Sequence, residues 1–100
     1  MIHPVWPVAR LAALTDVIYV HVDMDVLDPS EVAGHPLTAP EGPTSRELAA
    51  ALEVMFQHPK VGALGIASLP YGANDKDLVS LHAAYRLIDG AVAGVKKRPR

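Results

Sequence analysis

Residues 17–30 read Val-Ile-Tyr-Val-His-Val-Asp-Met-Asp-Val-Leu-Asp-Pro-Ser, an apolar stretch that gives way to an acidic one. Its first part, residues 17–22, consists of β-branched and aromatic side chains with almost no polar alternation. Such a run is typical of a strand buried on both faces in a parallel sheet. In open α/β sheets, ligands bind beyond the carboxyl ends of the strands, so the acidic residues 23–30 stand where a site is expected.

A helix and a second strand are predicted further along the chain. Thr44 and Glu47 have the spacing of a capping box, and the apolar residues after them repeat at helical intervals until Pro59. Residues 61–67, Val-Gly-Ala-Leu-Gly-Ile-Ala, form a second apolar run. This run predicts another buried strand, although its glycines weaken the pattern.

The two ends of the chain give weaker patterns. An apolar stripe over residues 78–95 predicts a last helix, which we expect Asn74 to cap. Residues 96–100 are a basic tail that we expect to be solvated. Residues 1–16 are expected to be irregular, because their prolines resist regular structure until about Val8, after which one or two helical turns can form.

The predicted order is strand, helix, strand, helix, which is one right-handed βαβ crossover with a trailing helix. Two parallel strands cannot cover both faces and both edges of their own sheet. We therefore predict an α/β fold in which residues 1–100 form a single partial domain. It would be completed by a longer protein, by self-association into a homo-oligomer, or by another chain.

The composition excludes several classes of protein. The chain has 100 residues, 50% hydrophobic and 20% charged, with a net charge of −2 and no cysteine. It is too apolar for a disordered chain, too weakly charged for a typical nucleic-acid binder, and cannot form disulfides or zinc–thiolate sites. Neither an uninterrupted apolar run of about 18 residues nor a signal peptide is evident. We expect a soluble, cytoplasmic protein with no nucleic-acid or membrane partner.

The acidic segment predicts a metal site. While the strand stays extended, His21, Asp23 and Asp25 project to the same side. Two adjacent carboxylates repel each other unless a cation neutralises them, and magnesium or manganese prefers oxygen ligands of this kind. The alternative is a pair of solvated loop acids, with Asp28-Pro29 forming an ordinary turn.

Three segments together resemble the C-terminal portion of the arginase/agmatinase (ureohydrolase) family: residues 20–30 with their D-x-D-x-L-D-P pattern, the G-H-P of residues 34–36, and residues 41–47 with T-x-R-E. The resemblance implies a three-layer α/β/α fold and a hydrolase of C–N bonds other than peptide bonds. It also implies two manganese ions (Mn²⁺) with a hydroxide that bridges them. This hydroxide would attack the carbon of a linear amidine- or guanidine-type C–N bond in a small-molecule substrate. Asp23 would bridge both ions, and Asp25 would bind one of them.

The resemblance extends over about residues 19–95, but the sequence departs from the family in three ways. His21 stands where the family usually has a small residue, and Pro43 replaces the leucine of its G-L-T. The earlier ligand blocks of the family, G-G-D-H and D-A-H-x-D, do not occur here. Ser68 stands where arginases and agmatinases carry a glutamate that grips the guanidinium. Ser68 and His35 are thus candidate substrate contacts, with an exposed loop histidine as the alternative for His35. His21 is a candidate for a bond that orients a metal ligand, or else packs beside the strand on a backbone carbonyl.

Other functions remain open on this evidence. The chain can be a catalytically silent family remnant, or a subunit that another chain completes. A strand ending in D-x-D also resembles the haloacid-dehalogenase phosphatases, in which the first aspartate, here Asp23, is the nucleophile. That family expects glycine and then threonine or valine after the second aspartate, whereas Val26 and Leu27 follow here. The spacing does not fit an EF-hand calcium loop.

Overall fold

The computed structural model describes residues 5–32, 42–70 and 72–99. The helices and strands follow in the order α1 (Val5–Ala12), β1 (Ile18–Asp23), α2 (Ser45–Met55), β2 (Val61–Ala67) and α3 (Val79–Lys96). Short 3₁₀ turns follow β1, namely η1 (Met24–Val26) and η2 (Pro29–Glu31), and precede α3, namely η3 (Gly72–Asn74) and η4 (Lys76–Leu78). The predicted partial α/β fold is confirmed.

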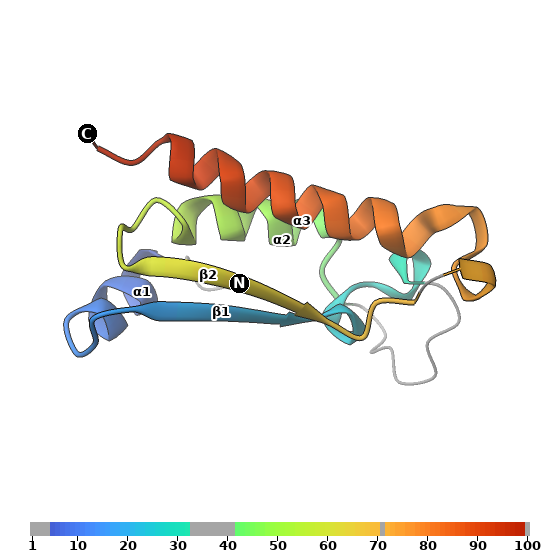
Figure 1. Cartoon of the computed structure of the whole chain (residues 1–100), viewed down its shortest axis with the longest axis horizontal. Helices are drawn as coiled ribbons and strands as arrows, with labels where there is room; N and C mark the ends of the chain where they lie inside the picture. Colours follow the sequence, from blue (N-terminus) through green and yellow to red (C-terminus); the bar gives the residue numbers. More distant parts are fainter. Residues whose placement is uncertain (1–4, 33–41, 71, 100) are drawn as a thin grey trace.

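The two strands pair in parallel, as predicted. Their register runs from Ile18 opposite Val61 to Asp23 opposite Ala67, with one irregularity just after Ile18. Helices α2 and α3 lie on the same side of the strands (Figure 1). The carboxyl ends of β1 and β2 therefore meet at one edge of the sheet, which is where the acidic segment begins.

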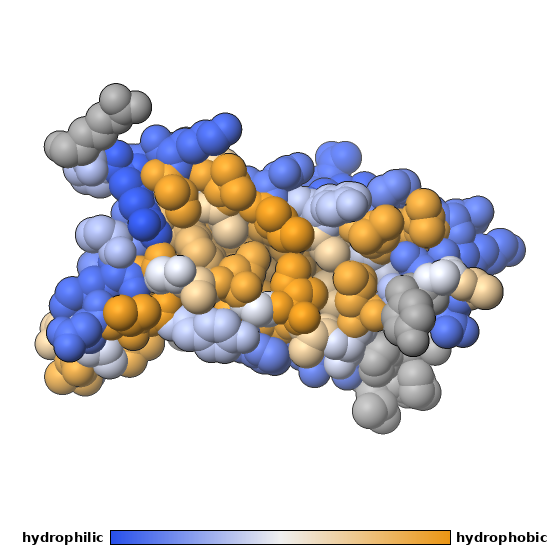
Figure 2. Space-filling model, in the orientation of Figure 1, coloured by the Kyte–Doolittle hydropathy of each residue, from blue (hydrophilic) through white to orange (hydrophobic). Residues whose placement is uncertain are grey.

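Burial of β1 differs from the expectation. Ile18 and Val22 are buried against the helices, whereas Tyr19, His21 and Asp23 on the opposite face are exposed. The described part of the chain therefore covers only one face of this strand. Figure 2 shows a broad band of apolar side chains at the surface. The larger exposed apolar residues are Leu11, Leu14, Val17, Tyr19, Val26, Leu78, Tyr85, Ile88, Val92 and Val95.

The core lies between the strands and the two long helices. Leu52 of α2 and Leu87 of α3 are fully buried. Glycines let the helices approach closely: a Cβ atom on Gly90 would lie 2.4 Å from the carbonyl oxygen of Ala49. The capping box predicted at the start of α2 is present, with both reciprocal hydrogen bonds formed.

The N-terminal segment corrects one expectation. Within residues 1–16, which the sequence predicted to be irregular, α1 begins at Val5 and continues through Pro7. Proline is tolerated there because the first backbone N–H groups of a helix have no intrahelical partner. At the other end of α1, the Lys60 ammonium donates to the carbonyl oxygens of Ala12 at 2.7 Å and Thr15 at 2.9 Å. This contact ties the helix to the start of β2.

The side chain that caps the start of α3 is that of Asp75, not that of Asn74, which lies in η3. The two carboxylate oxygens of Asp75 accept hydrogen bonds from the backbone N–H groups of Ser80 at 2.8 Å and Leu81 at 3.0 Å. Burial acts to raise the pKa of Asp75, but these hydrogen bonds outweigh it and hold the pKa below its ordinary value. Sequence spacing favours a cap immediately before the helix, whereas η4 separates Asp75 from α3.

Contrary to the expectation of a solvated tail, the basic C-terminal residues 96–99 are not all free in solvent: Lys96, Lys97 and Pro99 are exposed, but Arg98 is half-buried. Helix α3 includes Lys96, and the Lys97 ammonium pairs with the Glu53 carboxylate. Arg98 is half-buried, and its guanidinium donates to the carbonyl oxygens of Phe56 at 2.7 Å and Val61 at 2.6 Å. These residues therefore join α3 to the end of α2 and the start of β2.

The segment Lys76–Lys96 is long and apolar enough, with a mean hydropathy of 1.2, to cross a membrane. Charged residues, among them Asp77, Arg86 and Asp89, interrupt this segment, so it contains no continuous apolar run of membrane-spanning length. The core helix of a water-soluble fold has the same length and composition, and α3 packs its buried side against α2. The property therefore assigns no membrane role to α3.

Candidate functional site

The candidate site lies at the carboxyl edge of the sheet. Asp23 is the last residue of β1 and is exposed. It stands opposite Ala67, the last residue of β2, so Ser68 follows at the same edge. The structure thus brings Asp23 and Ser68 to one edge although they are far apart in the sequence, as the parallel pairing predicts.

Asp25 reaches this edge by a different route from the one predicted. The chain leaves the extended conformation at Met24, where η1 begins, so the two-residue period of the strand does not place Asp25. The side chains of Met24 and Leu27 are fully buried in the core, and their burial forces the turn. The carboxylate of Asp23 accepts a hydrogen bond from the Asp25 backbone N–H at 3.0 Å. This bond holds the two aspartates next to each other.

His21 lies on the exposed face of β1, two residues before Asp23 and on the same face. Its Nδ1 atom shares a hydrogen bond of 3.2 Å with the Tyr19 hydroxyl. The Tyr19 hydroxyl lies over Gly65 of β2, where a Cβ atom would come within 1.8 Å of it. The Tyr19 hydroxyl, which has room over Gly65, therefore orients the His21 ring. This partner differs from the backbone carbonyl that the sequence pattern leaves open as the alternative.

Ser68 occupies an uncommon backbone conformation. Its φ is 62°, in the left-handed region that a residue with a side chain rarely adopts, and it is exposed. Such conformations cluster at functional sites, where the surrounding structure maintains them. The other predicted substrate contact, His35, lies outside the described residues.

The turn after the aspartates is built by Asp28 and Pro29, which the sequence pattern also predicts to form a turn. The Asp28 carboxylate caps η2 by accepting from the Ser30 backbone N–H at 3.2 Å. The Asp28 backbone N–H donates to the carbonyl oxygen of Pro43 at 2.9 Å. The turn is thereby attached to the segment that leads into α2.

A second attachment was missed by sequence reasoning. The Glu31 carboxylate, at the end of η2, accepts from the Ser45 hydroxyl at 2.7 Å, and Arg86 of α3 lies 3.6 Å from the same carboxylate. Ser45 lies 14 positions after Glu31 and 41 positions before Arg86, so no local sequence pattern could reveal these contacts.

The donors fit part of a manganese site. Two carboxylates at one sheet edge are the oxygen ligands that Mn²⁺ prefers. Within residues 5–32, 42–70 and 72–99, however, no group of three or more histidine, aspartate or glutamate side chains is placed to hold an ion. The described part of the chain therefore presents two neighbouring carboxylates at this edge, which are fewer donors than a metal site needs.

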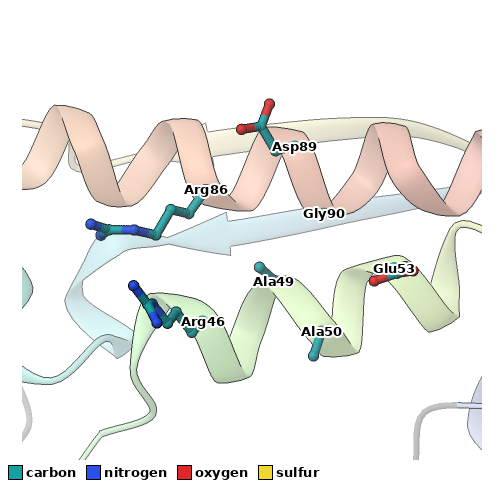
Figure 3. Close-up of a pocket in the computed structure, with 7 residues that line it drawn as sticks. All are labelled: Arg46, Ala49, Ala50, Glu53, Arg86, Asp89 and Gly90. Atoms are coloured by element: carbon teal, nitrogen blue, oxygen red, sulfur yellow. The ribbon is translucent and has the colours of Figure 1, made fainter.

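Two hollows that border α3 lie away from this edge. One, of about 310 Å³, lies between α2 and α3, where Arg46 and Arg86 stand near one end and Glu53 stands further along α2 (Figure 3). The other, of about 520 Å³, has mostly apolar walls from β2 and α3, including Leu64, Ile88 and Val92. Neither includes Asp23, Asp25 or Ser68 in its lining, so the described chemistry belongs to the sheet edge.

Comparison with known proteins gives consistent matches. A family model described as the arginase family matches residues 7–88. The chain is 36% identical over 85 residues to formimidoylglutamase of Bacillus subtilis (strain 168), which is 85% of this chain and 26% of that protein. The crystal structure of formimidoylglutamase from the same species superposes with a TM-score of 0.80 at 33% identity, covering 92% of this chain and 29% of the other.

A more distant structure shows the same fold. Arginase from Bacillus caldovelox superposes with a TM-score of 0.75 at 24% identity, covering 91% of this chain and 30% of that one. The chain therefore spans between a quarter and a third of the length of these relatives. The matches favour the arginase resemblance over the phosphatase alternative.

Proposed function

Because the chain belongs to the arginase family, we propose that it is part of a manganese-dependent hydrolase that cleaves a linear C–N bond of the amidine or guanidine type. One observation carries the proposal: Asp23 and Asp25 are held next to each other, by a 3.0 Å hydrogen bond, at the carboxyl edge of a parallel sheet. This is where α/β folds place their ligands, and the matched relatives are hydrolases of this family.

The chain's own residues would have distinct roles in such a site. Asp23 and Asp25 would hold two manganese ions, which when bound lower the pKa of water and polarise the carbon to be attacked. Asp23, at the end of the strand, would contact both ions, and Asp25 in η1 would contact one. His21, oriented by the Tyr19 hydroxyl, lies on the Asp23 face and would orient that carboxylate.

The substrate class follows from the residue after β2. Ser68 offers a neutral hydroxyl, whereas a guanidinium group is bound best by a carboxylate. A relative of 36% identity is a formimidoylglutamase, so an N-formimidoyl compound is the first substrate class to test. Ser68, together with His35, would contact the polar parts of that substrate.

The proposed site needs more ligands than the two carboxylates that the described residues supply. The chain spans 26% of the formimidoylglutamase that it matches, and it contributes two carboxylates. We propose that the remaining ligands come from the rest of a longer protein, from another chain, or from a homo-oligomer. The exposed apolar residues on β1 and α3 support completion by further polypeptide. The competing proposal is a family remnant that binds manganese weakly or not at all.

A manganese titration followed by calorimetry tests the proposal. We expect Asp23→Asn to abolish binding by the purified chain, while Asp16→Asn leaves it unchanged because Asp16 precedes β1 at the opposite end of the strand. Circular dichroism establishes that both variants fold. Binding that survives Asp23→Asn would refute the proposal. Absence of binding in the unmodified chain would mean that the chain holds half a site, and the function must then be sought in a longer protein or in the partner that supplies the other ligands.

A further inference from the structure

A cluster of three side chains joins the turn of the candidate site to both long helices. Glu31, the last residue of η2, has a side chain that is only 20% exposed. Its two carboxylate oxygens accept hydrogen bonds from one residue, Ser45: one from the backbone N–H and one, at 2.7 Å, from the hydroxyl. Ser45 begins α2 and is fully buried.

Arg86 completes the cluster from α3. Its guanidinium donates to the Ser45 hydroxyl at 3.2 Å and lies 3.6 Å from the Glu31 carboxylate. A partly buried carboxylate is stabilised when a positive charge and hydrogen-bond donors surround it. The end of η2, the start of α2 and the middle of α3 are therefore held at one point.

This point lies close in sequence to the proposed manganese ligands. The segment between β1 and η2 has a second attachment, from the Asp28 backbone N–H to the Pro43 carbonyl oxygen. It also packs tightly against Gly42, where a Cβ atom would lie 2.3 Å from the carbonyl oxygen of Val26. The turn is thus fixed by strand pairing at Asp23 and by the cluster at Glu31.

We infer that Glu31, Ser45 and Arg86 form a clamp that positions the turn carrying Asp23 and Asp25. Turns as short as η1 and η2 have weak hydrogen-bond geometry of their own, and ligands must be held within a fraction of an ångström to bind an ion well. The three are positioning residues. The inference rests on the proposed function only in assigning manganese binding to Asp23 and Asp25; the clamp itself does not depend on it.

Hydrogen exchange of backbone amides, followed by NMR without metal, tests the clamp directly. In Arg86→Met and Glu31→Gln we expect the amides of Asp28 and Glu31 to exchange about tenfold faster, because local opening of the turn becomes easier. Amides in the middle of α2 and β2 should keep their rates. Lys97→Met is the matched control, because it removes a different cation, at the C-terminal end of α3, that pairs with Glu53 of α2 and not with Glu31, and it should leave the turn unchanged.

Three outcomes would overturn the inference: unchanged exchange in the turn, equal acceleration at every amide, or the same effect in Lys97→Met. Arg86→Lys keeps the charge near Glu31 and should restore part of the protection, which loss of packing alone would not explain. A second measurement follows the broadening of Asp23 and Asp25 resonances by added Mn²⁺, which should fall several-fold in Arg86→Met. If the unmodified chain shows no broadening, its two aspartates do not hold Mn²⁺ without further ligands, while the exchange result still decides on the clamp.

Discussion

Arg98 offers a sharp test of how this small fold is held together. Its guanidinium reaches back from the end of α3 and donates to the carbonyl oxygens of Phe56, at 2.7 Å, and Val61, at 2.6 Å. Phe56 closes the C-terminus of α2, and Val61 begins β2. Replacing Arg98 by methionine keeps an unbranched apolar stem but removes the guanidinium and with it both hydrogen bonds.

The size of the effect follows from these contacts. A hydrogen bond that involves a charged group contributes about 1.5–3 kcal/mol to stability. Arg98 is half-buried, so water can reach the released carbonyl groups in part, and the two contributions will not add fully. We expect Arg98→Met to lower the free energy of unfolding by about 2 kcal/mol, which is a large share of the stability of a small domain.

Lys97→Met is the matched control for Arg98→Met. The neighbouring Lys97 also carries one positive charge, but its partner is the Glu53 carboxylate at the surface, where the two side chains are 59% and 30% exposed. Surface ion pairs of this kind contribute about 0–1 kcal/mol and weaken in salt. Lys97→Met should therefore cost less than Arg98→Met, and its effect should shrink at high salt.

Urea unfolding followed by circular dichroism measures both variants. With a slope of about 1–3 kcal/mol per molar urea, a loss of about 2 kcal/mol shifts the midpoint by roughly 1 M. Arg98→Lys should recover part of the stability, because a single ammonium cannot reproduce the forked geometry of the guanidinium. The reasoning is refuted if Arg98→Met and Lys97→Met destabilise the chain equally, or if high salt abolishes both effects.

Three further predictions concern the core and the cap of α3. Gly94→Ala should destabilise the chain by about 1–3 kcal/mol in urea unfolding despite its better helix propensity, because the new Cβ atom would lie 2.4 Å from a carbonyl oxygen of α2. Leu52→Ala should cost about 2–5 kcal/mol in the same assay, since this side chain is fully buried; a loss below 1 kcal/mol would contradict the packing. Burial raises the pKa of Asp75, but the N–H groups of Ser80 and Leu81 outweigh it and lower the pKa below 3.8, so its charged form stabilises the fold above that pH. This contribution is lost as the pH falls through the lower value of the folded state, and urea midpoints from neutral pH to about pH 3 should fall less steeply in Asp75→Asn than in the unmodified chain.

The elements that sequence reasoning predicted well depend on contacts between near neighbours. The capping box of Thr44 and Glu47 needs only residues three positions apart, and both of its bonds form as predicted. The two apolar runs form parallel strands because β-branched side chains favour the extended backbone. The edge that carries Asp23 and Ser68 follows from that pairing, so half of the candidate site was within reach of the sequence.

The remaining features depend on groups that are distant in the sequence. The turn at Asp25 forms because Met24 is drawn into a core made by other elements, which a two-residue period cannot anticipate. The contacts of Arg98 with Phe56 and Val61 span 42 and 37 positions, so a pattern of basic residues predicted only solvation. A short polar segment has no periodicity that distinguishes a free tail from one that binds backbone carbonyls.

The sequence by itself determined the order of strands and helices, the capping of α2 and the identity of the acidic turn, since each follows from local side-chain chemistry. Only the tertiary structure decided how that turn is held. Glu31 and Ser45 are 14 positions apart, and Arg86 lies 41 positions beyond Ser45. Their meeting depends on how α2 and α3 pack on the sheet, and packing is a property of the whole fold. The sequence therefore identified Asp23 and Asp25 as candidate residues, and the packing of α2 and α3 determines the contacts that hold the turn after them.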